Sequence, residues 1–188
     1  EATIVNNESR EIMRMLDTEF ERLATTGASF YPEELREEVD RALDELYEPV
    51  NNGVYRAGFA ATQEAYDEAV TGLFDALDRY EELLGRRRYL LGGRVTEADW
   101  AFFTTLVRFD PVYHYHFKCN LRRIADYPNL WGYLRDLYQR PGVAETVRLD
   151  HIKEHYYTSH ASINPSRIVP KGPVLDLSAP HGRERLGG

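Results

Sequence analysis

Val95-Thr96-Glu97-Ala98-Asp99-Trp100 is the stretch of sequence that decides the fold. A threonine followed three residues later by an acid, directly before an apolar run, is the pattern of a helix capping box. In such a box Thr96 caps the backbone N–H of Asp99, and the carboxylate of Asp99 accepts a hydrogen bond from the N–H of Thr96. Val95 and Trp100 flank the box at the positions of a hydrophobic staple. The stretch therefore predicts that a helix begins directly after Thr96.

The residues that follow the box are apolar on nearly every side of that helix. Phe102, Phe103, Leu106 and Val107 leave little room for a polar face. A helix that is hydrophobic all round is buried in the core. We therefore expect this helix to lie at the centre of the protein.

Apolar residues recur at helical spacing in most of the remaining chain. The first of these segments is opened by Pro32 and contains Leu46, and a long amphipathic segment spans 63–84. A third segment is opened by Pro128 and stopped at Pro141. The last contains Val147, Ile152 and Tyr156. Asn51-Asn52-Gly53 is interpreted as a turn between the first two segments. Helix predominates, and the sequence predicts an all-α protein.

The first residues of the chain carry a different pattern. Thr3-Ile4-Val5 is interpreted as the end of a strand, and Asn6-Asn7-Glu8-Ser9 as a polar turn. An apolar series that ends at Phe20 then predicts an opening helix. Thr25-Thr26-Gly27 breaks this helix, and beyond Pro165 the chain is rich in Pro and Gly and is expected to be extended.

The composition excludes several classes of function. A net charge of −8 argues against a nucleic-acid partner, since nucleic-acid binding needs a basic face. We find no apolar run of about 20 residues and no charged-then-apolar leader, so we expect no membrane span and a cytoplasmic protein. The one cysteine excludes an internal disulfide and a CxxC pair.

The histidines raise the question of a metal site. His151 and His155 stand four residues apart on a predicted helix, a spacing that can ligate one ion. The intervening residues give HIKEH rather than the HExxH of zinc proteases, and no cysteine or carboxylate completes a site. His114 and His116 alternate in a stretch interpreted as irregular. We therefore predict that the protein binds no metal.

Cys119 is the only candidate for a thiol nucleophile. Lys118 and Arg122 nearby would lower the pKa of its thiol, but the residue lacks a helix start. Lone cysteines usually behave as small buried hydrophobes, so we predict a structural role for Cys119. The paired tyrosines at 113 and 115 and at 156 and 157 fit either core packing or a pocket for a flat ligand.

Several long strings of the sequence carry a family resemblance. The capping box and the segment YPNLWGYLRDLYQRPGV resemble the C-terminal helical domain of glutathione transferases. LVRFDPVY, HFKCNLRRIADYPNLWGYL, PGVAETV, HIKEHYYTSHASINP and IVPKGP are similar to strings of the glutathionyl-hydroquinone reductases, the Xi class of these transferases. These strings cover most of residues 89–173, and GVYRAGFA extends the resemblance to residues 53–60.

The resemblance implies an all-α glutathione-transferase C-terminal-like bundle, preceded by a short strand and helix that end a thioredoxin-like domain. The implied division is 1–26 for that remnant, 27–165 for the helical domain and 166–188 for an extended tail. In the family a cysteine of a Cys-Pro-Trp-type motif in the thioredoxin-like domain attacks the sulfur of a glutathionyl-hydroquinone and releases the hydroquinone through a mixed disulfide. This sequence lacks that motif, so we expect an enzyme whose 188 residues alone show no turnover.

The site residues follow from the same resemblance. Glu8 and Ser9 match the turn that holds the γ-glutamyl end of glutathione. Tyr55 and Tyr156 match tyrosines that line the quinone pocket, with Tyr157 as the alternative for the latter if the register slips by one. Arg88 is a further candidate for that pocket.

The resemblance also implies the ligands and the partners. They are a quinone or hydroquinone conjugate, glutathione or a related γ-glutamyl thiol, and a second copy of the chain in a homodimer. Exposed aromatics between Tyr113 and Phe117 are candidates for the dimer contact. A conjugating glutathione transferase and a non-catalytic helical binding module remain alternative functions.

Overall fold

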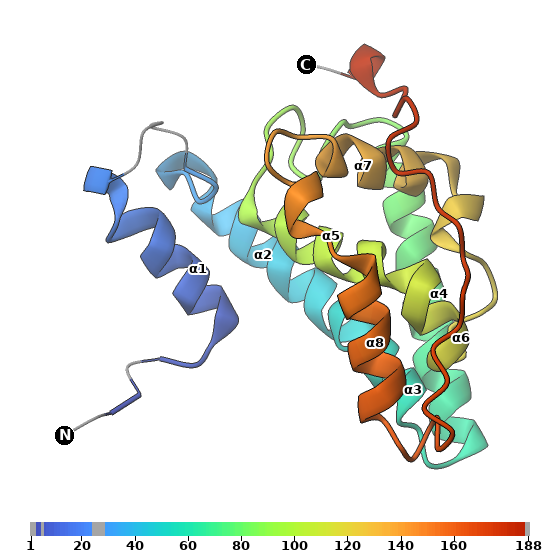
Figure 1. Ribbon diagram of the computed structural model, residues 1–188. Coiled ribbons are helices and arrows are strands. Elements are labelled where there is room, and N and C mark those ends of the chain that lie inside the picture. The colour runs from blue at the N-terminus through green and yellow to red at the C-terminus, as the bar shows by residue number, and fades with distance from the viewer. Residues whose placement is uncertain (1–2, 5, 24–28, 187–188) are drawn as a thin grey trace.

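The computed structural model describes residues 3–4, 6–23 and 29–186, and shows a helical bundle with one helix standing apart from it (Figure 1). The helices are α1 Ser9–Thr18, α2 Arg36–Leu46, α3 Gly53–Gly58, α4 Gln63–Leu84, α5 Glu97–Arg108, α6 His114–His116, α7 Pro128–Tyr138 and α8 Leu149–Ser159. Among the described residues the only β interaction is an isolated bridge between Tyr89 and Gly92. The predicted all-α class is confirmed.

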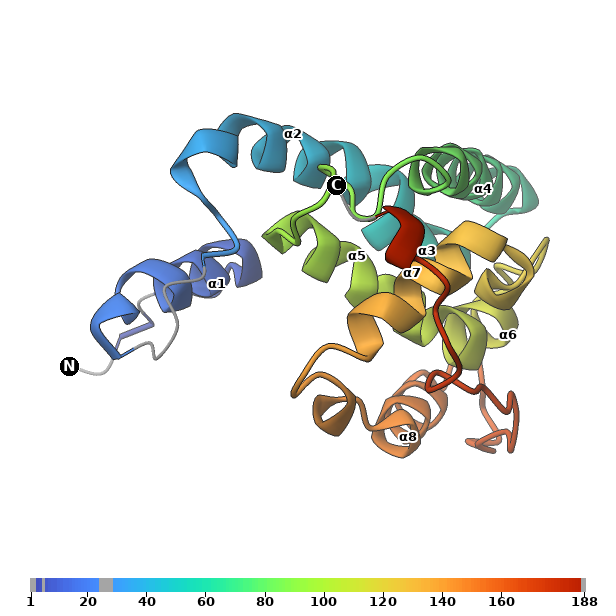
Figure 2. The same cartoon turned by 90° about the horizontal axis from the view of Figure 1, so that it is seen from above.

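Helix α5 occupies the centre of the bundle, with α2 and α4 on one side and α7 and α8 on the other (Figure 2). Thr96 and Asp99 form the predicted capping box, and the N–H of Thr96 donates to the Asp99 carboxylate over 2.8 Å. The same carboxylate accepts the Leu90 N–H at 2.9 Å and the Tyr133 hydroxyl at 2.8 Å. One buried side chain therefore ties the start of α5 to the preceding loop and to α7. The staple between Val95 and Trp100 stays a prediction.

Helix α4 has the bounds that the sequence predicts, because local signals define both of its ends. The hydroxyl of Thr62 accepts the N–H of Ala65 at 3.2 Å and caps the first turn, while Gly85 follows the last residue. Leu73 and Leu77 are completely buried on its inner face. Helical spacing alone was therefore sufficient to identify the core-facing side of this helix.

Two π-helical turns, Tyr47–Asn51 and Phe109–Tyr113, continue α2 and α5. Each contains an acid, a proline and a valine in succession, Glu48-Pro49-Val50 and Asp110-Pro111-Val112. Proline has no N–H to donate, and its ring crowds the carbonyl four residues earlier, so the helix widens to i→i+5 bonding. The turn expected at 51–53 is therefore shorter than predicted: Asn51 ends the π turn that continues α2, only Asn52 is a turn, and α3 begins at Gly53.

The N-terminal part differs from its prediction in one respect. Thr3 and Ile4 carry no strand, and Val5 lies outside the described residues. A strand needs a neighbouring strand to receive its hydrogen bonds, and the described chain offers none. The opening helix is confirmed as α1, whereas the break at 25–27 and the boundary between 26 and 27 lie outside the described residues.

The chain beyond Pro165 is largely extended, with a turn at 177–179 and a short 3-10 turn at Glu184–Leu186, and it runs back along the bundle (Figure 1). Arg183 fastens this tail. Its guanidinium is buried and donates to the backbone carbonyls of Leu84 at 2.9 Å, Arg87 at 2.6 Å and Arg88 at 2.8 Å. The tail thus satisfies carbonyls at the end of α4 that would otherwise lack partners.

Candidate functional site

Three tyrosines from distant parts of the chain bring their hydroxyl groups together. Tyr55 lies on α3, Tyr113 ends the second π turn, and Tyr156 lies on α8. The hydroxyl oxygens are 2.5 Å apart between Tyr55 and Tyr156, 3.0 Å between Tyr113 and Tyr156, and 3.4 Å between Tyr55 and Tyr113. We call these residues the tyrosine trio.

A glycine lets α3 approach closely enough for the trio to form. A Cβ atom on Gly58 would overlap the ring of Phe117, which is completely buried. The Phe117 ring in turn stacks on Tyr113 at 5.5 Å between centroids. The GVYRAGF string therefore combines a tyrosine of the trio with the glycine that positions its helix.

The trio borders a cavity of about 280 Å³. Its other lining residues are Asn51, Thr104, Thr105 and Arg108. Hydroxyl, amide and guanidinium groups thus surround the space. Such a lining suits a ligand that carries oxygen atoms better than a purely hydrocarbon ligand.

Tyr113 and Tyr156 are protonated at neutral pH. Burial raises the pKa of Tyr156 to about 12, although hydrogen bonding to Tyr113 and the charge of Arg108 act against this rise. Burial and the neighbouring tyrosines also raise the pKa of Tyr113 far above its usual range. Each of these hydroxyls therefore has a proton to donate, and an oxygen of a ligand can replace one of the mutual contacts.

Glu8 and Ser9 lie at the start of α1 and line a second cavity of about 430 Å³. Its opposite wall comes from α2, the first π turn and α5. Asn51 lines both this cavity and the one beside the trio. Its amide nitrogen donates to the carbonyl of Ala101 at 3.0 Å, which fixes the side chain between the two spaces. The two cavities therefore share Asn51 as a common wall.

The structure does not bring the other two candidates of the quinone pocket to the trio. Arg88 donates two hydrogen bonds to Asp136 on α7, at 2.8 and 3.0 Å. Tyr157 is buried, and its hydroxyl donates to the carbonyl of Pro111 at 3.2 Å. Of the two adjacent tyrosines on α8, Tyr156 is the one whose hydroxyl faces the cavity.

Cys119 has no access to solvent. Its sulfur lies 3.8 Å from the carbonyl oxygen of Phe117, and burial raises the pKa of the thiol to about 12. The thiolate is the nucleophilic form of cysteine, so Cys119 is not a nucleophile at neutral pH.

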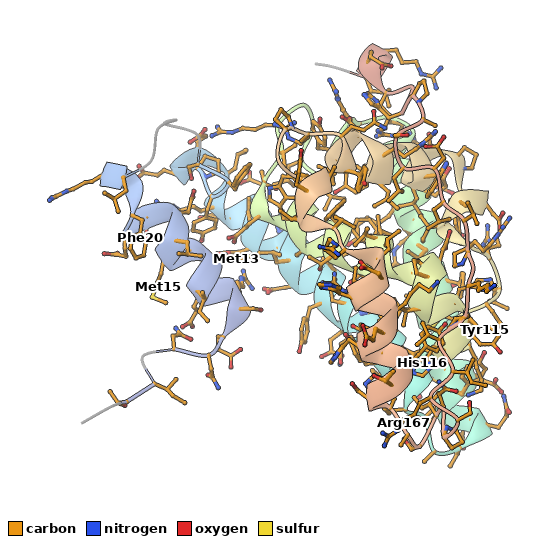
Figure 3. All side chains as sticks on the ribbon, in the orientation of Figure 1. Met13, Met15, Phe20, Tyr115, His116 and Arg167 are labelled. Atoms are coloured by element: carbon orange, nitrogen blue, oxygen red, sulfur yellow. The ribbon has the colours of Figure 1, made fainter. Side chains whose placement is uncertain are left out.

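Two of the histidines lie close together. His116 and His160 lie 3.1 Å apart between ring nitrogens, on α6 and directly after α8 (Figure 3). His151 and His155 are exposed on α8. In the described part of the chain no three histidine, cysteine or acidic residues are placed to share a metal ion. None of its helices is long and apolar enough to cross a membrane.

Sequence reasoning did not single out Arg108 or Asn51, and it left Tyr113 between packing and a pocket. Arg108 and Tyr113 are the third and last residues of LVRFDPVY, one of the strings that carry the resemblance. The π turn between them places both at the same cavity. An acid-Pro-Val sequence at the end of an apolar helix was the available signal, because π turns occur frequently at functional sites.

Comparison with known proteins identifies a family for the chain. Residues 63–136 match the family model of the glutathione S-transferase C-terminal domain. The chain is 56% identical to the glutathionyl-hydroquinone reductase YqjG of Escherichia coli strain K12 over 97% of its own length and 56% of that protein. It therefore spans little more than half the length of that curated relative.

Solved structures extend the likeness to three dimensions. A Xi class glutathione transferase from Natrialba magadii superposes with a TM-score of 0.96 at 61% identity, covering 98% of this chain and 56% of that one. The glutathione-bound structure of YqjG from Escherichia coli K-12 gives a TM-score of 0.94 at 55% identity, with 97% and 59% covered.

Proposed function

Because the chain belongs to the glutathione transferase family through its C-terminal helical domain, we propose that the whole protein is a thiol-dependent reductase that removes glutathione from glutathionyl-hydroquinones. The tyrosine trio at a polar cavity is the observation that carries this proposal. The identity to a relative named for that activity supports it over nearly the whole chain.

The proposed reaction transfers the glutathionyl sulfur to a cysteine thiolate. In the keto tautomer of the substrate the sulfur-bearing ring carbon already holds a hydrogen. Attack on sulfur forms an enzyme–glutathione disulfide, and the electrons of the C–S bond move to the ring oxygen, so the hydroquinone leaves as a phenolate. A second glutathione thiolate then attacks the mixed disulfide, which restores the cysteine thiolate and yields glutathione disulfide.

The trio supplies hydrogen-bond donors for the ring oxygen of the substrate. Negative charge develops on a ring oxygen during sulfur transfer, and hydroxyl donors fixed in advance lower the energy of that charge. Tyr156 makes the two shortest hydroxyl contacts within the trio, at 2.5 and 3.0 Å, so its hydroxyl is the proposed central donor. The phenolate takes up a proton from water after it leaves.

Glu8 and Ser9 are the proposed holders of the γ-glutamyl end. The carboxylate of Glu8 pairs with the ammonium group of glutathione. The hydroxyl of Ser9 and the free N–H groups at the start of α1 bind its carboxylate. The cavity beside Glu8 adjoins the trio through Asn51, which suits a conjugate with glutathione at one end and a ring at the other.

The nucleophile of the whole protein is proposed to lie in a thioredoxin-like domain, to which residues 1–26 belong. Exposed apolar side chains support this assignment, because Leu16 and Phe20 of this segment are 60% and 51% exposed and Leu23 is 78% exposed. A second domain packed on them would remove that surface from water. We further propose a cytoplasmic homodimer with glutathione, or a related γ-glutamyl thiol, as its co-substrate.

The test is an assay of the whole protein with a glutathionylated hydroquinone and free glutathione. We expect release of hydroquinone and glutathione disulfide in equal amounts, measured by liquid chromatography. Tyr156→Phe removes the central donor and should lower kcat by about 100-fold. Tyr138→Phe is the matched control, since Tyr138 lies on α7 and outside the cavity.

Two results would contradict the proposal. One is the absence of hydroquinone release by the whole protein, and the other is conjugation of glutathione to an electrophile without any release. Residues 1–188 alone, which hold only the buried Cys119, are predicted to release no hydroquinone.

A further inference from the structure

Arg108 is the one charged residue among the described residues that line the cavity of the trio. It is the last residue of α5 and is half-buried. One guanidinium nitrogen donates to the carbonyl of Thr104 at 2.7 Å, which anchors the side chain to its own helix. Its remaining N–H groups have no hydrogen-bond partner within the described chain and keep contact with solvent.

Two other half-buried arginines, by contrast, are paired with acids. Arg88 pairs with Asp136 at 2.8 Å, and Arg14 pairs with Glu97. In a chain of net charge −8, no carboxylate of the described residues lies within 4 Å of the Arg108 guanidinium. An uncompensated guanidinium beside a polar cavity favours a negatively charged ligand.

The charge of Arg108 also acts on the trio itself. It opposes the rise that burial causes in the pKa of Tyr156. The guanidinium and the Tyr156 hydroxyl therefore influence the same part of the cavity. An anionic oxygen held by the trio would lie within the field of Arg108.

We infer that Arg108 binds the negatively charged ring oxygen of the departing hydroquinone, next to the hydroxyl of Tyr156. This inference rests on the proposed function and assigns its substrate preference. Hydroquinones whose rings stabilise a phenolate are the preferred class, because the guanidinium stabilises the anion more than the neutral phenol.

Glutathione offers a second source of negative oxygen in its two carboxylates. A substrate that keeps glutathione and lacks the ring separates the two sources. The mixed disulfide of glutathione with 2-mercaptoethanol is such a substrate, since the same enzyme thiolate attacks its glutathionyl sulfur and releases a thiolate instead of a phenolate.

The first experiment compares these two substrates in the whole protein. In Arg108→Gln, the ratio of kcat/KM for the glutathionyl-hydroquinone to kcat/KM for the mixed disulfide should fall at least tenfold. Arg108→Lys keeps the charge and should recover part of that ratio. Arg86→Gln is the matched control, because Arg86 is exposed and has no side-chain hydrogen bond within the described residues. An unchanged ratio in Arg108→Gln overturns the inference, whether both activities fall together or neither falls.

The second experiment measures anion binding without turnover. 4-Nitrophenol changes its absorbance when it ionises, so titration of the bound dye reports its pKa. We expect the whole protein to lower the pKa of the bound dye, and Arg108→Gln to abolish this shift. An equal shift in both proteins overturns the inference. If the dye shift depends on Arg108 but no hydroquinone is released, the proposed reaction fails while the anion-binding role of Arg108 stands.

Discussion

Helix α1 and the bundle formed by α2 to α8 are held in place by different forces. No residue of α1 is buried, and it stands to one side of the other helices (Figure 2). Met13 and Met15 lie on this separate helix, and Phe20 follows its end (Figure 3). Its hydrogen bonds to the bundle come from two arginines, Arg10 to Asp40 and Asp44, and Arg14 to Asp40 and Glu97. The bundle, by contrast, is built around a continuous apolar core.

The difference predicts how each region responds to its surroundings. Removal of apolar or buried polar groups should unfold the bundle as one unit, because its core is shared by all of its long helices. Charge pairs at a partly exposed surface contribute little free energy and are screened by salt. We therefore expect α1 to detach under conditions that leave the bundle folded.

Asp99→Ala should give the largest loss of stability. The carboxylate of Asp99 receives hydrogen bonds from Thr96, Leu90 and Tyr133, and the substitution leaves these buried donors without a partner. We expect the free energy of unfolding to fall by about 3–5 kcal/mol, measured by urea denaturation. Asp75→Ala on exposed α4 surface is the control. If the free energy of unfolding fell by less than about 1 kcal/mol, the hydrogen bonds of Asp99 would not be important for the stability of the bundle.

Arg183→Ala tests whether the tail belongs to the bundle. The substitution removes a buried guanidinium from the carbonyls at the end of α4, so these carbonyls lose charge-assisted hydrogen bonds. We expect a loss of about 2–3 kcal/mol in the free energy of unfolding and faster proteolysis of residues 166–186. Arg185→Ala, two residues further on and outside these contacts, should change neither measurement. Proteolysis of the tail without any loss of stability would assign the tail to the loosely held part of the molecule.

Local signals in the sequence were sufficient for most of the bundle. The capping box at Thr96 and the cap at Thr62 involve residues at most three positions apart, so a single sequence reveals them. The series on α4 repeats at the helical period and identifies its buried face. Such features depend on neighbours along the chain rather than on the tertiary fold.

The candidate site depended on contacts that no local pattern encodes. Tyr55 and Tyr113 meet across 58 residues, and Tyr113 and Tyr156 meet across 43. The family resemblance supplied Tyr55 and Tyr156, whereas spacing alone left Tyr156 open between core packing and a pocket and did not single out Tyr55. The side chain of Arg88 does not reach the trio because it is hydrogen-bonded to Asp136, an acid 48 residues away in the sequence. The π turns escaped prediction because proline more often ends a helix than widens it.

Acid should weaken the bundle through His116. Burial, and then the charges of His160 and Lys118, lower the pKa of His116 to about 4. Between that value and the ordinary pKa of about 6.5 the unfolded chain binds a proton that the folded chain does not, so stability falls as the pH is lowered through this window. We expect the contribution to be on the order of 1–3 kcal/mol.

His116→Phe isolates this effect. The variant keeps a ring stacked between Phe117 and His160 and removes the titrating group. The difference in stability between wild type and variant, measured by urea denaturation from pH 7 to pH 4, should become more favourable to the variant as the pH falls. His151→Phe on the exposed face of α8 should show no such trend. A constant difference for His116→Phe would mean that the folded protein accepts the proton.

Glu97→Gln should have the smallest effect on the bundle and the clearest effect on α1. Arg14 donates to the nearly buried Glu97 carboxylate at 2.8 Å, and the substitution keeps the shape of the side chain while it removes the charge. We expect a loss of about 1 kcal/mol or less in unfolding of the bundle, with about fivefold faster hydrogen exchange in α1. Glu64→Gln is the matched control, since Glu64 occupies the first turn of α4 but is exposed.

Raising the ionic strength from about 0.1 M to about 1 M should reproduce the faster hydrogen exchange of α1 in the wild type, because the screening length falls from about 10 Å to about 3 Å. Equal exchange in α1 with and without the Glu97 charge would show that contacts other than ion pairs hold this helix.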